Sequence, residues 1–580
     1  MSGGERAATR PSGGSAPAGL LDAVRAYERA LAADDVPALA AAFAPGPDAL
    51  RGDAAGLLAG HDAITAFRGS RGGAPARALA EVQVRELGPD LALVMSVTAP
   101  HAGGAGLVTQ VWSRADGGWR ILAAHVQGPA AAFDPSVWRV LGDPLVPGAA
   151  SPAADGSALP LAGVRVAVKD VVEVQGHAMG AGNPAFLASA RPAVRTAPAL
   201  RALLDAGASV RGIARTDELA YSVAGRNAHT GTPPNPRVPR GLPGGSTSGP
   251  AAAVALGHAD LALGTDTAGS IRVPASYQGL WGLRPTHGAV PVEGVLPLAP
   301  TFDTVGWIAR SPEVLRRAAV ATLGEGAASS ETPAAASSSA APGLVVATAL
   351  LRACDDAVRD AFTALVSALE ASGAIAPVEV VGLDDLDDLP GIAADLRVVQ
   401  AAEAWRAHGD FVAAHPGSLG EDVAARFAYA RTVGPADESA ARQRLAERRA
   451  ALERVLGGRI LLLPSTSSPA PDRRGDAAAV DAARTATLAL TSLAGVLGRP
   501  ALSAPLLEVP ARPPLGDATA PAVGPASEPV GLCLVGPPGS ELRLIDLAAS
   551  WAAARDASRA PAAPAPSDPA PPTPDQTGPA

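Results

Sequence analysis

The chain has 580 residues, 48% of them hydrophobic and 3% aromatic, with a formal net charge of -9. This length suggests two or more domains or one large one, and the acidic balance argues against a nucleic-acid-binding protein, which would present a basic face. Two cysteines, Cys354 and Cys533, provide neither a disulfide framework nor a zinc-binding spacing. Because the N-terminus lacks an apolar signal segment and no run of about 18 apolar residues occurs, we expect a cytoplasmic protein without a membrane span.

Both ends of the chain lack hydrophobic periodicity. Residues 1–18 and 556–580 are rich in Ala, Pro, Gly, Ser and Thr, and the internal stretch 324–342 has a similar composition. Such segments cannot bury enough apolar surface to fold. We therefore predict disordered tails at both ends and a flexible segment at 324–342.

Residues 19–130 form the first predicted domain. Apolar residues between Leu20 and Leu31 recur at the spacing of one helix face, and a second short helix is expected at 62–68. Four strand-like runs with alternating polarity follow: LAEVQVREL, LALVMSV, GLVTQVWSRA and WRILAAHVQ. Helices followed by a four-stranded antiparallel meander indicate an α+β domain.

Three segments of this domain, AYERALAADDVPAL, GHDAITAFRGSR and TQVWSRADGGWRILAAHV, resemble the AtzH-like family in their order. The resemblance implies a cone-shaped α+β fold, in which a curved sheet surrounds a pocket. It would place Arg68, Arg71 and His125 near that pocket. The alternative is that both arginines are solvated at the surface and that the histidine is an ordinary strand residue. Dimerisation or ligand binding is as open a role for this domain as catalysis.

Residues 131–157 are expected to be a linker, and residues 158–555 form the second predicted domain. Apolar strand-like runs (VRVAV, GRILLLP and VGLCLVG) alternate there with amphipathic helical runs at 196–206, 355–371 and 438–456. Such alternation favours an α/β fold, in which helices cover a central sheet.

The strand-like run VRVAVKDVVEV contains Lys169, which is the single lysine among the 47 Lys and Arg residues of the chain. Burial disfavours the charged form of a lysine, so that it can lose its proton, whereas an arginine stays charged. Lys169 is therefore a candidate general base. The alternative is that compositional bias happened to leave one lysine.

Two loops rich in small residues follow, PGGSTSG around Ser246 and LGTDTAGSIRVPAS around Ser270. A serine hydroxyl needs a neighbouring base to act as a nucleophile, and small residues let backbone amides approach a developing oxyanion. No serine lies in a G-x-S-x-G elbow, which disfavours a hydrolase of that kind. Taken alone, each loop can also be interpreted as a flexible Gly/Ser loop or a tight turn.

Together, VAVKD, PGGSTSG and LGTDTAGSIRVPAS resemble the amidase signature family in this order, and the resemblance extends over most of 158–555. It implies an α/β fold with a mixed central sheet flanked by helices. It also implies a triad in which Ser270 is the nucleophile, Ser246 the bridging serine and Lys169 the base. The oxyanion hole would consist of the backbone amides of Thr267, Ala268, Gly269 and Ser270.

The chain departs from the family pattern at two positions. Thr247 replaces the second serine of the usual GGSS and keeps a hydroxyl, while Ala268 replaces a glycine and is tolerated unless its φ is positive. We therefore expect activity to survive. Asp266 and Arg272 are predicted to brace the nucleophile loop as an ion pair, and Asp170 is also interpreted as structural.

The resemblance implies an amidase that converts a small amide to a carboxylate and ammonia or an amine, through an acyl-enzyme and without a cofactor or metal ion. Segments such as TFDTVGW look closest to the branch that includes indole-acetamide hydrolases, whereas the AtzH-like domain points to a biuret-type or ureido-type hydrolase. An amidotransferase subunit, which needs a partner enzyme, is a further alternative. The expected partner is a small-molecule amide, with no nucleic acid and no membrane, and a homodimer is left open.

Overall fold

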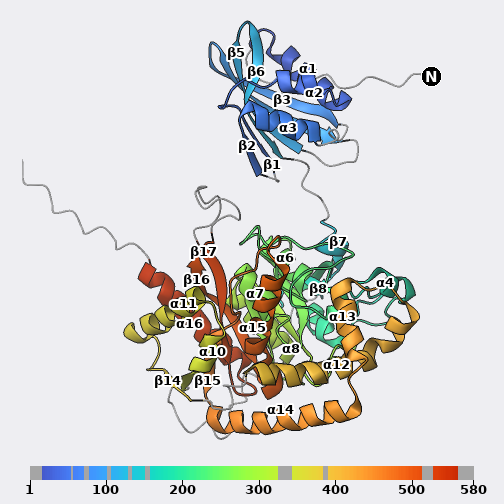
Figure 1. Cartoon of the computed structure of the whole chain (residues 1–580), viewed down its shortest axis with the longest axis vertical. Coiled ribbons are helices and arrows are strands. Elements are labelled where there is room, and N and C mark those ends of the chain that lie inside the picture. Colours follow the sequence, from blue (N-terminus) through green and yellow to red (C-terminus); the bar gives the residue numbers. More distant parts are fainter. Residues whose placement is uncertain are drawn as a thin grey trace, which may run out of the picture. The chain divides into compact units, whose positions relative to one another are not determined.

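The computed structural model divides the chain into two compact units, the first ending at Asp134 and the second beginning at Pro135. Figure 1 shows both units, which are treated separately below. The structure describes residues 16–53, 56–70, 77–100, 106–127, 134–150, 157–323, 343–382, 389–512 and 527–559. The predicted flexible segment at 324–342 and most of both predicted tails lie outside the described residues.

In the first unit, helices pack against one face of a sheet. The helices are α1 (Leu20–Ala33), α2 (Val36–Ala41) and α3 (His61–Ser70). The described strands form a six-stranded sheet in the order β2-β1-β6-β5-β4-β3. Their bounds are β1 (Leu50–Asp53), β2 (Gly56–Ala59), β3 (Arg77–Gly88), β4 (Leu91–Pro100), β5 (Gly106–Ala115) and β6 (Gly118–Gln127). Strands β3 to β6 form the predicted antiparallel meander.

The core of the first unit lies between α1 and the sheet, where Tyr27 packs edge-on against Trp112. Arg68 is buried there, and its Nη2 donates to the Tyr27 hydroxyl at 2.5 Å. His125, in contrast, is exposed on β6, whereas the adjacent Ala124 is buried. The structure therefore places Arg68 inside the domain, while His125 fits the alternative of an ordinary strand residue. Arg71 lies outside the described residues.

The described strands of the second unit form an eleven-stranded sheet in the order β14-β13-β15-β17-β16-β11-β12-β10-β8-β9-β7. It contains parallel pairs such as β8–β10 and antiparallel pairs such as β16–β17, which confirms the predicted mixed sheet. The bounds are β7 (Trp138–Val146), β8 (Arg165–Lys169), β9 (Ser209–Ala214), β10 (Leu261–Asp266), β11 (Trp281–Arg284), β12 (Thr304–Ala309), β13 (Leu344–Val346), β14 (Glu379–Val380), β15 (Ile460–Pro464), β16 (Ala501–Pro510) and β17 (Ser527–Val535).

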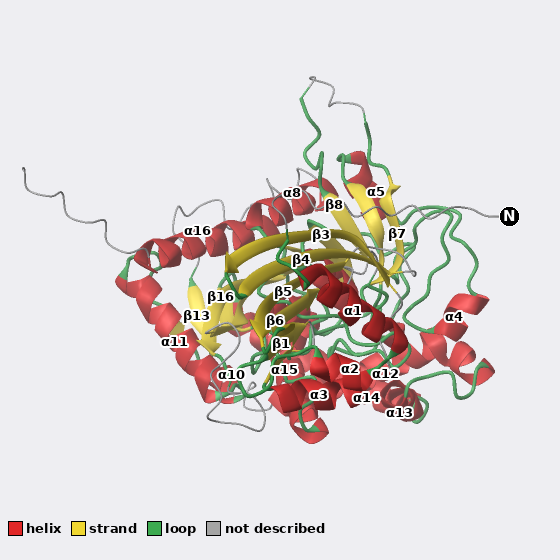
Figure 2. Ribbon diagram, turned by 90° about the horizontal axis from the view of Figure 1, so that it is seen from above, coloured by secondary structure: helices red, strands yellow, loops and turns green. Residues whose placement is uncertain are grey.

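Helices lie on both sides of this sheet, as Figure 2 shows. Strand β8 illustrates why, since Val166 and Val168 face the larger core cluster and Ala167 faces a smaller one that includes residues of α6. A strand buried on both faces is apolar without alternation. The helices are α4 (Pro184–Ser189), α5 (Pro198–Asp205), α6 (Ser248–Ala255), α7 (Arg272–Gln278), α8 (Pro312–Leu323), α10 (Thr348–Arg352), α11 (Asp356–Ala371), α12 (Leu389–Ala414), α13 (Glu421–Ala430), α14 (Pro435–Leu456), α15 (Ala477–Leu497) and α16 (Glu541–Arg559), with a 3-10 turn at Glu218–Ala220.

Two predicted boundaries need correction. The predicted linker at 131–157 contains strand β7, whose Trp138 is buried and which pairs antiparallel with β9. The sequence hides this strand because Gly142-Asp143-Pro144 interrupts its apolar pattern and its partner lies far along the chain. The C-terminal tail predicted from residue 556 also starts too early, because α16 continues to Arg559.

Candidate active site

Lys169 is the last residue of β8 and is completely buried. Its Nζ donates to the Ser246 hydroxyl at 2.8 Å and to the Thr265 hydroxyl at 2.7 Å. Because β8 and β10 run parallel, Lys169 and Thr265 meet at the same edge of the sheet. The structure thus brings together two of the three predicted triad residues, which are 77 positions apart in the sequence.

Burial lowers the pKa of Lys169 to about 7, although the carboxylates of Asp217, Asp266 and Asp303 act in the opposite direction. A general base is most effective when its pKa lies near the working pH. When neutral, Nζ carries a lone pair that can accept the proton of the Ser246 hydroxyl. The hydrogen bond to Ser246 and the lowered pKa of Lys169 are therefore those expected of a general base.

Hydrogen bonds from residues 216–217 hold the loop that carries Ser246 in place. The carbonyl oxygen of Ser246 accepts from the Thr216 hydroxyl at 2.8 Å and from the Asp217 amide at 3.3 Å. The preceding Gly245, joined to Ser246 by a cis peptide bond, has no room for a Cβ because the Asp217 carboxylate occupies that position. The Asp217 carboxylate therefore requires a glycine at position 245.

Asp217 is a buried residue that contacts the Ser246 loop, and it belongs to no recognisable sequence motif. Its Oδ2 accepts from the Gly225 amide at 2.9 Å, and its Oδ1 accepts from the Ser248 hydroxyl at 2.9 Å. Burial raises the pKa of Asp217, and these hydrogen bonds act against that rise. Asp217 joins the loop around Gly225 to the beginning of α6, two residues after Ser246. A lone Asp in a loop offers no spacing from which this role could be inferred.

Ser270 lies in the turn between β10 and α7, and this turn wraps around the carboxylate of Asp266. The carboxylate accepts from the amide of Gly269 at 2.8 Å and from that of Ile271 at 3.1 Å. It also lies 2.8 Å from the guanidinium of Arg272, so the predicted ion pair is present. Burial alone would raise the pKa of Asp266, but Arg272, Arg284 and the Ile271 amide outweigh it and lower that pKa.

Asp170, also predicted to be structural, is a buried carboxylate next to the base. It lies 2.7 Å from Nε of Arg139 and accepts from the Gly180 amide at 2.9 Å. Both contacts hold surrounding chain segments in place, which agrees with that interpretation.

The predicted oxyanion hole needs one correction. The amide of Gly269 donates to Asp266 and is therefore engaged within the turn rather than offered to a ligand. Among the described residues, the amides of Thr267, Ala268 and Ser270 have no such acceptor. Gly269 has a φ of +131°, whereas Ala268 is not among the positive-φ residues, so its Cβ is accommodated as expected.

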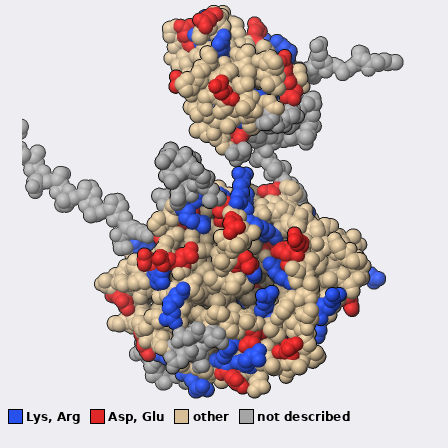
Figure 3. Space-filling model, in the orientation of Figure 1, with Lys and Arg blue, Asp and Glu red and all other residues tan. Residues whose placement is uncertain are grey.

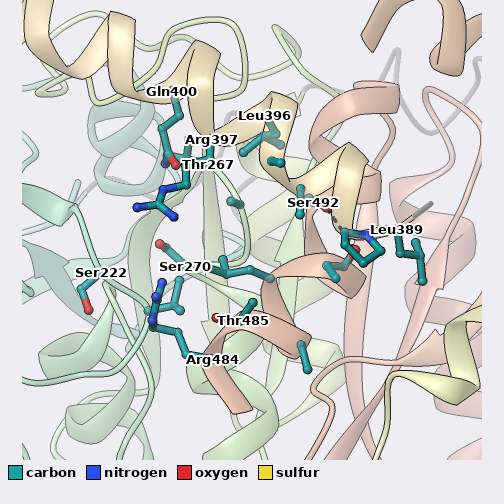
Figure 4. A pocket seen from close by; sticks show the side chains of 18 of the residues that line it. Ser222, Thr267, Ser270, Leu389, Leu396, Arg397, Gln400, Arg484, Thr485 and Ser492 are labelled. Carbon is teal, nitrogen blue, oxygen red and sulfur yellow. Dashed lines mark hydrogen bonds between the residues drawn. The ribbon is translucent and has the colours of Figure 1, made fainter. Parts of the chain in front are cut away.

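A cavity of about 930 Å³ opens onto Ser270, Thr267 and Ala268 (Figure 4). Its other walls come from the segment after the 3-10 turn and from helices α10, α12, α13 and α15. Neither Lys169 nor Ser246 is among its lining residues. Of the three predicted triad residues, Lys169 and Ser246 therefore lie in the interior, and Ser270 lies at the cavity wall.

The two serine loops meet where the Thr247 amide donates to the Ser270 carbonyl at 3.3 Å. Among the described residues, the hydroxyls of Ser246 and Ser270 form no direct hydrogen bond with each other. Catalytic hydrogen bonds often tighten only when a substrate is bound.

A metal site and a membrane-spanning helix have requirements that the described residues do not meet. No group of three or more His, Cys, Asp or Glu side chains within them is arranged to hold a metal ion. In the same residues, no helix is both long and apolar enough to cross a membrane. On the face of the molecule drawn in Figure 3, acidic and basic side chains are interspersed.

Comparisons with known proteins identify the family of both parts of the chain. The Amidase family model matches residues 148–545, and the AtzH-like family model matches residues 16–130. Amidase 1 of Arabidopsis thaliana is 34% identical over 384 residues, which cover 61% of this chain and 88% of that protein. A solved structure described as an amidase superimposes with a TM-score of 0.57 at 29% identity, over 69% of this chain and 86% of the other.

A second solved structure comes from work on a vestigial protein complex and the origins of an s-triazine catabolic enzyme. It superimposes with a TM-score of 0.58 at 27% identity, over 70% of this chain and 86% of the other. The chain therefore belongs to the amidase family, carries an AtzH-like domain before its amidase domain, and is a hydrolase of amide carbon–nitrogen bonds.

Proposed function

We propose that this chain is a stand-alone amidase that cleaves a small-molecule amide through an acyl-enzyme on Ser270. The observation that carries the proposal is the 2.8 Å hydrogen bond between Lys169 Nζ and Ser246 Oγ. It joins a hydroxyl to an amine whose pKa burial lowers to about 7. The cavity of about 930 Å³ beside Ser270 is of the size of small-molecule sites, which supports a small substrate.

In the acylation half of the reaction, neutral Lys169 accepts the proton of Ser246 while Ser246 accepts the proton of Ser270. The Ser270 oxygen attacks the amide carbon, and the carbonyl π electrons move onto the oxygen. The amides of Thr267, Ala268 and Ser270 are the donors proposed to stabilise that oxyanion. When the carbonyl forms again, the carbon–nitrogen bond breaks, and the proton returns through Ser246 to the leaving nitrogen.

In the deacylation half, water takes the place of the leaving amine. It gives a proton to the Ser246–Lys169 relay and attacks the acyl carbon. The ester bond to Ser270 then breaks, and the serine oxygen recovers its proton from the relay. The products are a carboxylate and ammonia or an amine, and the enzyme returns to its starting state.

The test uses the purified full chain and a panel of simple amides, with biuret included to cover the ureido alternative. We expect turnover without a partner protein, a covalent adduct on Ser270 detected by mass spectrometry, and no turnover by Ser270→Ala. Near-normal activity of that variant would refute the assignment. Turnover by the isolated chain also counts against an amidotransferase subunit, which would need its partner enzyme.

The homodimer and the cytoplasmic location stay predictions. Sizing of the purified chain tests the first, and fractionation of cells that express it tests the second.

A further inference from the structure

Positive charge is concentrated in the cavity beside Ser270. Its described lining contains four arginines and neither aspartate nor glutamate, although the chain as a whole carries a net charge of -9. The arginines are Arg352, Arg397, Arg426 and Arg484.

Two of these arginines are paired with acidic residues of their own helices. Arg426 lies 3.3 Å from the Asp422 carboxylate on α13 and donates to the Tyr221 carbonyl at 2.5 Å. Arg484 donates twice to one carboxylate oxygen of Asp481 on α15, at 2.9 and 2.7 Å. Arg352 has an interaction partner as well. The charges of Arg426 and Arg484 are therefore partly compensated before any ligand binds.

Arg397 on α12 differs from them. It is exposed, and among the described residues no carboxylate lies within ion-pair distance of its guanidinium. Its guanidinium carbon lies 4.9 Å from the centre of the Tyr429 ring, a cation–π contact. This contact orients the guanidinium and does not neutralise it, so its N–H groups can still donate to an anion.

Arg397 also points to the reacting end of the cavity. In Figure 4, its guanidinium and that of Arg484 extend from opposite sides towards Ser270. Gln400 lies one helical turn beyond Arg397, so the two side chains share a face of α12, and both line the cavity. An arginine fork with a neighbouring amide suits the two oxygens of a carboxylate.

We propose that the substrate carries a carboxylate in addition to the amide that is cleaved, and that Arg397, with Arg484 opposite, binds this carboxylate. The substrate class is then the half-amide of a dicarboxylic acid. One uncompensated guanidinium matches the single charge of a carboxylate better than the double charge of a phosphate. The inference rests on the proposed function, because the scissile amide is placed at Ser270.

The kinetic test compares half-amides with neutral diamides of the same shape, using malonamate, succinamate and glutaramate against malonamide, succinamide and glutaramide. For at least one length, we expect the wild-type kcat/KM for the half-amide to exceed that for the diamide by tenfold or more. A hydrogen-bonded charge contact supports a change of about 10- to 150-fold. Arg397→Gln should lower the half-amide to diamide ratio by that factor, and Arg397→Lys should restore part of it.

The matched control is Arg406→Gln, which removes the same charge from the same helix. Arg406 is 56% exposed, pairs with Glu438 at 2.7 Å and is not among the cavity-lining residues. It should leave the ratio unchanged. If the wild type hydrolyses half-amides and diamides equally well and Arg397→Gln leaves their ratio unchanged, the inference is overturned while the proposed function stands.

If no amide is turned over, that result counts against the proposed function but does not test the carboxylate site. A binding test then decides whether the carboxylate site exists. Calorimetry measures binding of the three half-amides and three diamides to full-length Ser270→Ala, with and without Arg397→Gln. Tighter binding of a half-amide, weakened about tenfold or more by Arg397→Gln, supports the inference. Equal binding of both classes, or binding of neither, overturns it.

Discussion

Replacing Lys169 with arginine separates positive charge from basicity at the buried end of the relay. With a pKa of about 7, half of the Lys169 side chains are neutral at pH 7. The pKa of an arginine side chain is above about 12, so the neutral fraction of an arginine at pH 7 is below about 10⁻⁵. If only the neutral form accepts the Ser246 proton, Lys169→Arg should lower kcat/KM by about 10⁴-fold or more, limited by the background rate.

The same reasoning fixes the pH dependence of the wild type. Activity requires the neutral amine, so kcat/KM for a neutral amide should fall as the pH drops through about 7 and level off above it. Between pH 8 and pH 6, the neutral fraction falls about tenfold for a pKa of 7. The assay is ammonia release from an uncharged amide between pH 5.5 and 8.5, with circular dichroism to confirm that the chain remains folded.

Arg165→Lys is the matched control, because it places a lysine at the exposed beginning of the same strand, where Arg165 pairs with Asp260. It should leave both the rate and the pH profile unchanged. A flat wild-type profile over this range, or a Lys169→Arg variant that keeps its rate, would show that Lys169 is not the base.

Two further substitutions test the groups that hold the relay. Asp217→Asn removes a carboxylate that raises the pKa of Lys169, so the acid limb of the pH profile should move to lower pH; an unmoved limb, measured in the same assay, would contradict the placement of Asp217. Gly269→Ala puts a Cβ at a φ of +131° and 2.9 Å from Thr491 Oγ1, so the free energy of unfolding should fall by about 1–3 kcal/mol in a denaturant titration. Ala268→Gly is its control, and equal stability of the two variants would refute the strain argument.

Much of the fold could be predicted because its information is local. The buried runs around Val166 and Leu462 are long and apolar enough to mark strands β8 and β15. Short strands such as β13 and β14, with three and two residues, leave no comparable pattern. The strand order could not be derived either, because β11 pairs with β16 through contacts between residues more than 200 positions apart.

The site shows the same division between local and long-range information. Lys169, Ser246 and Ser270 stand in recognisable motifs, and the hydrogen bond between the first two agrees with the predicted triad. Asp217 and Arg397 stand in no motif, and only tertiary packing places one under the Ser246 loop and the other in the cavity wall. The engagement of the Gly269 amide by Asp266 is a property of the turn geometry, which composition does not encode.

The proposed need for two serines follows from the burial of the lysine. An amine in contact with the solvent of the cavity would keep a pKa near 10.4 and stay protonated at neutral pH. Complete burial removes that solvent and lowers the pKa, but it also keeps Lys169 out of the cavity lining, where a substrate would bind. A hydroxyl between the amine and the cavity resolves this conflict, because Ser246 can pass the proton of Ser270 inward while the charge that forms stays on a buried side chain surrounded by three carboxylates.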